Sequence, residues 1–170
     1  MNIRHVQLDD YLPIVTVMDD WWGGRRVSHL LPRLFFEHFR NTSFVIEQDD
    51  KIIRQDDPIT QQDDPIIAFL VGFLSQSQPD EAYIHFVGVH PGYRDRRLGK
   101  TLYELFFKTV RQHNCTIVRC ITSPVNTGSI AFHTRLGFQI EPQDTQANGV
   151  SYNTDHDGLG EPRVHFVKHI

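Results

Sequence analysis

The segment from Tyr83 to Phe106 constrains the fold of this chain more than any other. It reads YIHFVGVHPGYRDRRLGKTLYELF, in which an apolar run closes at Pro91-Gly92 and a basic loop follows. From Leu98 onward, apolar residues recur at helical spacing. The segment therefore predicts a strand, a tight turn, a glycine-containing loop and then a helix.

Strand-like segments dominate the first half of the chain, and strands alternate with helices in the second half. The expected strands are 2–7, 43–48, 66–76, 81–90, 115–122, 138–141 and 163–169, and the expected helices are 8–20, 29–39, 98–112 and 126–136. This order predicts one domain over residues 1–170 of the α/β (α+β) class. Its core would be a mixed, largely antiparallel sheet flanked by helices.

Composition narrows the classes of protein to which the chain belongs. A length of 170 residues fits one domain, and a net charge of -4 argues against a general nucleic-acid binder. The longest apolar run, Ile66–Leu74, has nine residues, which is too short to cross a bilayer. The N-terminus has no apolar signal core, so we expect a cytoplasmic protein without a membrane partner. Cys115 and Cys120 fall on opposite faces of one strand, so we expect free thiols and no metal site.

One acidic motif recurs at a spacing of seven residues between two predicted strands. The motif begins at Gln48, Gln55 and Gln62, each followed by two aspartates. A calcium site or a site for a basic partner is one interpretation. No glutamate follows at the EF-hand distance, and prolines break any helix. We therefore favour a flexible acidic hairpin insertion at 49–64.

The loop before the helix at Leu98 has the features of an anion-binding site. Backbone N–H groups at a helix start are unpaired and carry positive partial charge, which suits a phosphate. The loop adds four basic side chains and a glycine: Arg94, Arg96, Arg97, Lys100 and Gly99. A Walker motif would need glycine at position 94, so that phosphate loop is excluded. Taken alone, the segment is equally compatible with a basic surface patch.

A second motif follows the next predicted strand, and with it the sequence resembles the GNAT superfamily of acyl-CoA-dependent N-acyltransferases. The pyrophosphate loop of that family matches at Val89, Pro91, Arg94 and Gly99. Arg97 stands where the family has its first glycine, which would stiffen the loop or bring a guanidinium to a phosphate. The family's later helix motif matches at Asn126, Ser129, Gly137 and Phe138, with His133 in place of the usual tyrosine.

The spacing of the second motif gives independent support for a polar crevice. Asn126 and His133 are seven residues apart, so they lie on one helix face about 10 Å apart. Ser129 lies between them. An ordinary amphipathic helix edge is the alternative.

The resemblance implies acetyl-CoA as co-substrate and a V-shaped splay between the strands near 83–90 and 115–122. The backbone of Val87, Gly88 and Val89 would bind the pantetheine arm and polarise the thioester. The remaining cofactor residues implied by the resemblance are Arg94, Asp95, Arg96, Arg97, Leu98, Gly99, Lys100, Asn126 and Ser129.

The resemblance also implies the residues that handle protons. His133 would protonate the departing thiolate, and His85 would take the proton of the amine. Tyr83 shares its strand face with His85 and completes the expected catalytic set. Trp21 and Trp22 would wall the acceptor pocket. For His85 and for both tryptophans, packing in the core is an equally good interpretation.

The expected function is acetyl transfer from acetyl-CoA to a primary amine, with a small molecule as acceptor. A non-catalytic acyl-CoA sensor and a protein N-terminal acetyltransferase are the alternatives. A nucleic-acid-binding domain built on the basic loop is a third, which the net charge disfavours. We expect a monomer or a homodimer, no nucleic-acid partner and no metal.

Overall fold

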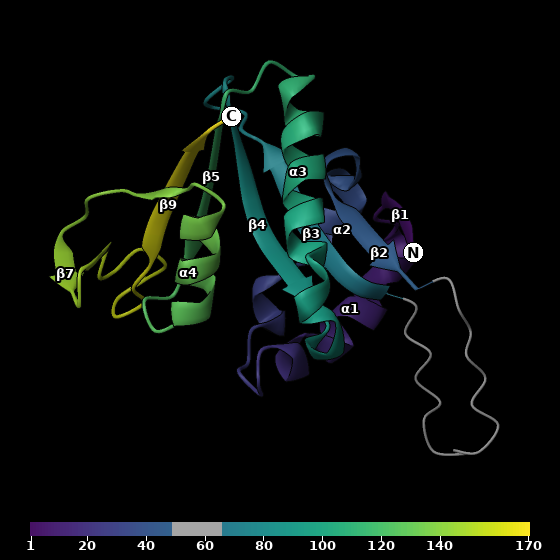
Figure 1. Cartoon of the computed structure of the whole chain (residues 1–170), viewed down its shortest axis with the longest axis horizontal. Coiled ribbons are helices and arrows are strands. Elements are labelled where there is room, and N and C mark those ends of the chain that lie inside the picture. Colours follow the sequence, from purple (N-terminus) through teal and green to yellow (C-terminus); the bar gives the residue numbers. More distant parts are fainter. Residues whose placement is uncertain (49–65) are drawn as a thin grey trace. The chain divides into compact units, whose positions relative to one another are not determined.

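The computed structural model describes residues 1–48 and 66–170 (Figure 1). The acidic repeats predicted to form an insertion at 49–64 lie outside the described residues. The α-helices are α1 (Tyr11–Trp21), α2 (Leu34–His38), α3 (Leu98–Arg111) and α4 (Thr127–Arg135). The strands are β1 (Asn2–His5), β2 (Phe44–Glu47), β3 (Ile66–Leu74), β4 (Glu81–Val89), β5 (Ile117–Thr122), β6 (Gln139–Ile140), β7 (Thr145–Ala147), β8 (Val150–Tyr152) and β9 (Val164–His169).

The main sheet is mixed and largely antiparallel, as the sequence predicts. Its strand order is β1-β2-β3-β4-β5-β9-β6. β4 and β5 form a parallel pair, in which residues 81–83 of β4 align with residues 117–119 of β5. β9 lies antiparallel between β5 and β6.

The chain divides into two compact units, and each is described by itself. The first comprises residues 1–72 and 86–106. Its core joins α1 and α2 to the strands through buried side chains such as Ile14, Met18, Phe36 and Phe69. Every residue of β3 from Ile66 to Val71 is buried, so this stretch is covered on both faces. Figure 1 shows α3 passing in front of β3.

The second unit comprises residues 73–85 and 107–170. β5 and β9 form its centre, and α4 packs against them through His133, which stacks on Phe166 of β9 with ring centroids 4.7 Å apart. Phe138 meets the same two rings edge-on. Cys120 is also buried on β5, opposite Phe166 in the strand register. Both cysteines are free, as expected.

Two elements differ from the sequence prediction. The single helix expected over 29–39 is wrong. The chain forms a 3-10 turn at Ser28–Leu30 and then the short α2, with Pro32 between them. A proline lacks the N–H that a continuous helix would use, which explains the break. The hairpin of β7 and β8 was not predicted, although its turn is Asn148-Gly149, a strong hairpin signal.

Candidate functional site

Backbone conformation determines the shape of the loop that joins β4 to α3. His90 caps a 3-10 helix, Pro91–Arg96, through Nδ1, which accepts a hydrogen bond from the Gly92 N–H at 3.1 Å. Arg97 then takes the left-handed conformation, with φ 60° and ψ 16°. α3 begins at the next residue, Leu98. A left-handed residue ends one turn sharply and starts the next helix, which is the role that glycine usually has.

Two of the basic side chains in this loop bind the protein itself. The Arg94 guanidinium donates to the Trp21 carbonyl at the end of α1, and its Nε lies 3.4 Å from the Val89 carbonyl. Arg96 lies over the Tyr93 ring at 4.7 Å. Arg94 therefore holds the loop to α1 and β4, and its guanidinium is already engaged.

Arg97 and Lys100 have exposed side chains at the start of α3. Lys100 makes an ion pair with Glu104 at 3.6 Å, and both side chains are more than half exposed, so this pair contributes little. The first N–H groups of a helix have no partner within the helix. Their positive partial charge and the two cations make the start of α3 a suitable place for a pyrophosphate.

The end of β4 lies under two aromatic rings of the first unit. A Cβ on Gly88 would come within 2.4 Å of Phe69 and 2.9 Å of Trp22, so only glycine fits there. Trp22 is half-buried and meets the Phe86 ring edge-on at 5.8 Å. Trp21 is buried in the core and contacts the rings of Phe69 and His90. Trp21 thus packs in the core, and the acceptor role of both tryptophans stays a prediction.

The start of α4 is organised by the second motif. The Asn126 side chain caps the helix by accepting a hydrogen bond from the Ser129 N–H at 3.2 Å. Nδ1 of His133 lies 2.8 Å from the Ser129 carbonyl, which can only accept, so Nδ1 carries a proton. Burial is the main cause that lowers the pKa of His133. The imidazole is therefore neutral at neutral pH, an environment typical of a core histidine.

Tyr83 and His85 share one face of β4, and both are half-buried. Burial raises the pKa of Tyr83 well above its usual range, so the phenol keeps its proton at any physiological pH. Tyr83 also stacks on Phe73 with ring centroids 5.4 Å apart. The catalytic roles predicted for Tyr83 and His85 stay predictions.

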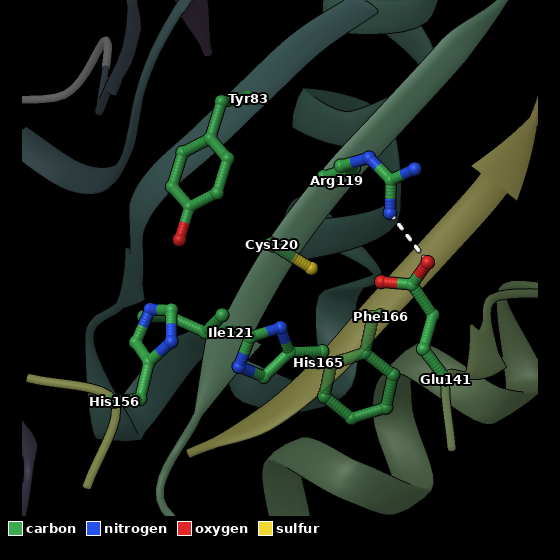
Figure 2. A pocket seen from close by; sticks show the side chains of 8 residues that line it. All are labelled: Tyr83, Arg119, Cys120, Ile121, Glu141, His156, His165 and Phe166. Atoms are coloured by element: carbon green, nitrogen blue, oxygen red, sulfur yellow. Dashed lines mark hydrogen bonds and ion pairs between the residues drawn. The ribbon is translucent and has the colours of Figure 1, made fainter. Parts of the chain in front are cut away.

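A pocket that the sequence did not reveal lies in the second unit. It has a volume of about 230 Å³ and is lined by Tyr83, Arg119, Glu141, His156 and His165 among others (Figure 2). The signal for it was weak: His165, Val167 and His169 alternate along β9 with the buried Val164 and Phe166.

Two features are absent from the described part of the chain. Within residues 1–48 and 66–170, no helix has the length and apolar character that crossing a membrane requires. In the same ranges no three or more His, Cys, Asp or Glu side chains are grouped so that they could hold a metal ion.

Comparison with known proteins identifies a family whose sequence pattern this chain matches. Residues 14–138 match the acetyltransferase (GNAT) family. The chain is 31% identical over 88 residues to the L-2,4-diaminobutyric acid acetyltransferase of Nocardia farcinica. That match spans 49% of this chain and 46% of the relative, less than half of either protein.

Solved structures agree with the observed architecture. yncA from Salmonella typhimurium, solved with its cofactor acetyl-CoA, has a TM-score of 0.64 at 17% identity, covering 99% of this chain and 93% of that one. The ribosomal-protein-alanine N-acetyltransferase of Brucella melitensis has a TM-score of 0.65 at 15% identity, covering 100% of both chains. At such identities the likeness shows the fold alone, and it confirms the expected GNAT-like architecture.

Proposed function

The chain belongs to the GNAT acetyltransferase family, and on that basis we propose that it transfers the acetyl group of acetyl-CoA to the primary amine of a small molecule. The observation that carries the proposal is the loop between β4 and α3. A left-handed Arg97 turns the chain directly into α3, whose first N–H groups suit a pyrophosphate. The buried Gly99 in that first turn lets the backbone approach the ligand closely.

The reaction requires the protein to position the amine and the thioester and to transfer protons. The neutral amine attacks the thioester carbonyl carbon, a C–N bond forms, and the C–S bond breaks. The nitrogen loses one proton, and the departing thiolate gains one. Backbone N–H groups of residues 87–89 would stabilise the negative charge that develops on the carbonyl oxygen. Such donors need no reorganisation during the reaction, because β4 already fixes them.

The three predicted catalytic residues differ in the roles that their surroundings support. Tyr83 keeps its proton because of its raised pKa, so we assign it the donor role toward the thiolate. His85 remains the candidate base, since histidine is the side chain that most often transfers protons as a general base. His133 was expected to be the acid. Its burial, its lowered pKa and its hydrogen bond to Ser129 support a packing role instead.

A small-molecule acceptor is supported by the relative from Nocardia farcinica, whose name gives a small diamino acid as substrate. The likeness to a ribosomal-protein-alanine N-acetyltransferase rests on 15% identity and supports the fold only. Protein N-termini are therefore the alternative acceptor, and a sensor without turnover is the alternative function.

Release of CoA from acetyl-CoA tests the proposal directly. We expect release with one or more primary amines from a panel of diamines, amino acids and aromatic amines. Mass spectrometry of the product should show the gain of one acetyl group. If CoA is released only with peptides that have free N-termini, the acceptor is a protein N-terminus and not a small amine. Tight acetyl-CoA binding without release for any amine or peptide would favour the sensor.

A further inference from the structure

The loop between α1 and α2, residues 23–33, contains arginine side chains that have no part in the proposed cofactor site. This α1–α2 loop has three arginines, Arg25, Arg26 and Arg33, and no aspartate or glutamate. Arg33 makes an exposed ion pair with Glu37 at 3.1 Å. Arg25 and Arg26 are exposed, and within the described residues neither makes an ion pair with a carboxylate. Two cations of the loop are therefore left for a ligand.

The backbone of the α1–α2 loop is held on both sides of these two arginines. Gly23 and Gly24 take φ of 71° and 81°, which favour glycine, and they turn the chain at the end of α1. The Asp19 carboxylate accepts hydrogen bonds from the N–H groups of Val27 and Ser28, both at 2.8 Å. This carboxylate is therefore engaged by the loop backbone, and the unpaired arginines lie on a short segment that is fixed at each end.

Arg25 differs from Arg26 because a hydrogen bond orients its guanidinium. Its Nε donates to the Trp22 carbonyl at 3.3 Å. A guanidinium has five N–H donors, so the two Nη groups of Arg25 remain for a ligand. Arg26 has no side-chain hydrogen bond within the described residues. The planar fork of a guanidinium matches both oxygens of a carboxylate, and such a two-point contact is stronger than a hydrogen bond between neutral groups.

Trp22 connects Arg25 to the part of β4 where the thioester is proposed to bind, and all of these residues belong to the first unit. A Cβ on Gly88 would come within 2.9 Å of the Trp22 indole. The indole is half-buried and meets the Phe86 ring edge-on at 5.8 Å. Trp22 thus contacts the end of β4 through its ring and Arg25 through its carbonyl. A short acceptor that lies along Trp22 can have its amine at one end and an anionic group at the other.

We propose that Arg25 binds the carboxylate of the acceptor, so that the acceptor is a short amino acid with its reacting amine at the end of the side chain. The two contact points lie at opposite ends of Trp22, so several bonds must separate the carboxylate from the reacting amine. The inference rests on the proposed function and gives the substrate class of the same site. A phosphate of CoA is the other anion that could reach the α1–α2 loop, and the experiment separates the two.

Two acceptors that differ only by a carboxylate test the inference: L-2,4-diaminobutyrate and 1,3-diaminopropane. We measure kcat/KM for each with the whole protein and acetyl-CoA. Arg25→Gln should lower kcat/KM for diaminobutyrate about tenfold and leave that for diaminopropane within about twofold. Tenfold is the lower end for a hydrogen bond between charged groups, because water screens an exposed guanidinium. The ratio of the two values therefore reports the carboxylate contact alone.

Arg26→Gln is the matched control, because it removes the same charge from the next residue of the loop. It should leave kcat/KM for diaminobutyrate within about twofold, whereas a general attraction of the loop for anions would make the two variants equal. Arg25→Lys keeps the charge but not the planar fork, so it should lose about as much as Arg25→Gln. Melting temperatures check folding, and Arg25→Lys takes the place of Arg25→Gln if the latter does not fold. Equal losses for both acceptors, no loss, or an equal loss in Arg26→Gln would overturn the inference.

Calorimetry separates this inference from the proposed function and from a cofactor contact. A weaker affinity of Arg25→Gln for acetyl-CoA would assign Arg25 to a phosphate of the cofactor and overturn the inference. CoA release with other amines, while diaminobutyrate neither reacts nor binds, would also overturn it and keep the acetyltransferase. If the wild type releases no CoA with any amine but binds diaminobutyrate in the presence of saturating CoA, and Arg25→Gln weakens that binding, the carboxylate site stands and the proposed reaction is rejected. Neither release nor binding would reject both.

Discussion

The loop between β4 and α3 and the pocket of the second unit are built in opposite ways. The loop is contiguous in sequence, and its geometry depends on backbone conformation: a capped 3-10 helix, a left-handed residue and the first turn of α3. The pocket gathers side chains from β4, β5, β9 and two intervening segments. One site is therefore fixed by local chain geometry, and the other by the packing of strands that are distant in sequence.

This difference decides how each site responds to change. A site made of backbone groups tolerates many different side chains, but it no longer binds its ligand when a side chain blocks access to the backbone. A side-chain site keeps its fold when one group is changed, but it loses the complementarity that the group supplied. Substitutions in the loop should therefore change acetyl-CoA affinity, whereas substitutions in the pocket should leave it unchanged.

The largest effect is expected for Gly99→Glu in the first turn of α3. A bulky, negative side chain would block the close approach of a pyrophosphate and repel it, so acetyl-CoA affinity should fall by about 100-fold or more. Calorimetry with acetyl-CoA measures the loss. Gln112→Glu adds the same charge just after α3 and serves as the control, with affinity unchanged. Full affinity in Gly99→Glu would mean that the cofactor binds elsewhere.

Gly88→Ala should test the aromatic cover of β4. The added methyl group would come within 2.4 Å of Phe69 and 2.9 Å of Trp22, so the rings must move. Overpacking of this kind costs about 1–3 kcal/mol of unfolding free energy, which denaturant titration measures. Gly128→Ala is the control: its Cβ would meet only Asn126 at 4.0 Å, and a helix gains about 0.5–1 kcal/mol from alanine. Equal stability of the two variants would contradict the close packing at Gly88.

The same contrast explains what the sequence could predict. Periodicity identified the main strands and helices, because burial of one face repeats along each element. The loop motif was found because its residues are consecutive. His133 was found by its position in the helix motif, but no local pattern reveals that Phe138 and Phe166 enclose it.

The pocket could not be predicted because no local pattern joins its residues. Arg119 of β5 contacts Glu81 because β5 pairs with β4, and it contacts Glu141 because the segment after β6 folds back beside β5. His165 shows only a strand alternation, which fits a surface residue equally well. The hairpin of β7 and β8 was a different kind of omission, since Asn148-Gly149 was visible in the sequence.

His133→Phe should reduce the pH dependence of stability. The folded-state pKa of His133 lies below its ordinary value of 6.5, because burial disfavours the charged ring. The unfolded chain takes up this proton near pH 6.5 while the folded protein does not, so the unfolding free energy falls as pH decreases below 6.5. His165 contributes with the same sign and should leave a residual slope. Melting temperatures between pH 7 and pH 5 measure both, and an unchanged slope in His133→Phe would contradict the lowered pKa.

Turnover of the same variant decides between packing and general-acid roles for His133. A general acid contributes about 10²–10⁴ in rate, whereas a packing residue replaced by an aromatic ring should cost less than tenfold. We expect the smaller loss, measured where the chemical step limits the rate. A loss above 100-fold with unchanged acetyl-CoA affinity would restore the general-acid role.

The smallest effect, and the one that separates backbone from charge within the loop, is expected for Arg97→Gly. Arg97 has φ 60°, and this left-handed conformation destabilises a folded protein by about 1–2 kcal/mol when the residue has a side chain. Glycine removes this strain, but it lowers the unfolding free energy by about 0.5–1 kcal/mol because the unfolded chain gains conformational freedom. The variant should therefore be more stable by about 0.5–1 kcal/mol in denaturant titration. Its acetyl-CoA affinity should fall a few-fold, because one exposed cation near the pyrophosphate is lost, and added salt should shrink that difference.

Arg97→Ala loses the charge but keeps the strain, so it should share the affinity loss without the gain in stability. Asn114→Gly is the backbone control: Asn114 has φ 64°, which asparagine tolerates, so stability should change less there. If Arg97→Gly and Arg97→Ala are equally stable, the loop accommodates a side chain at the motif glycine without strain.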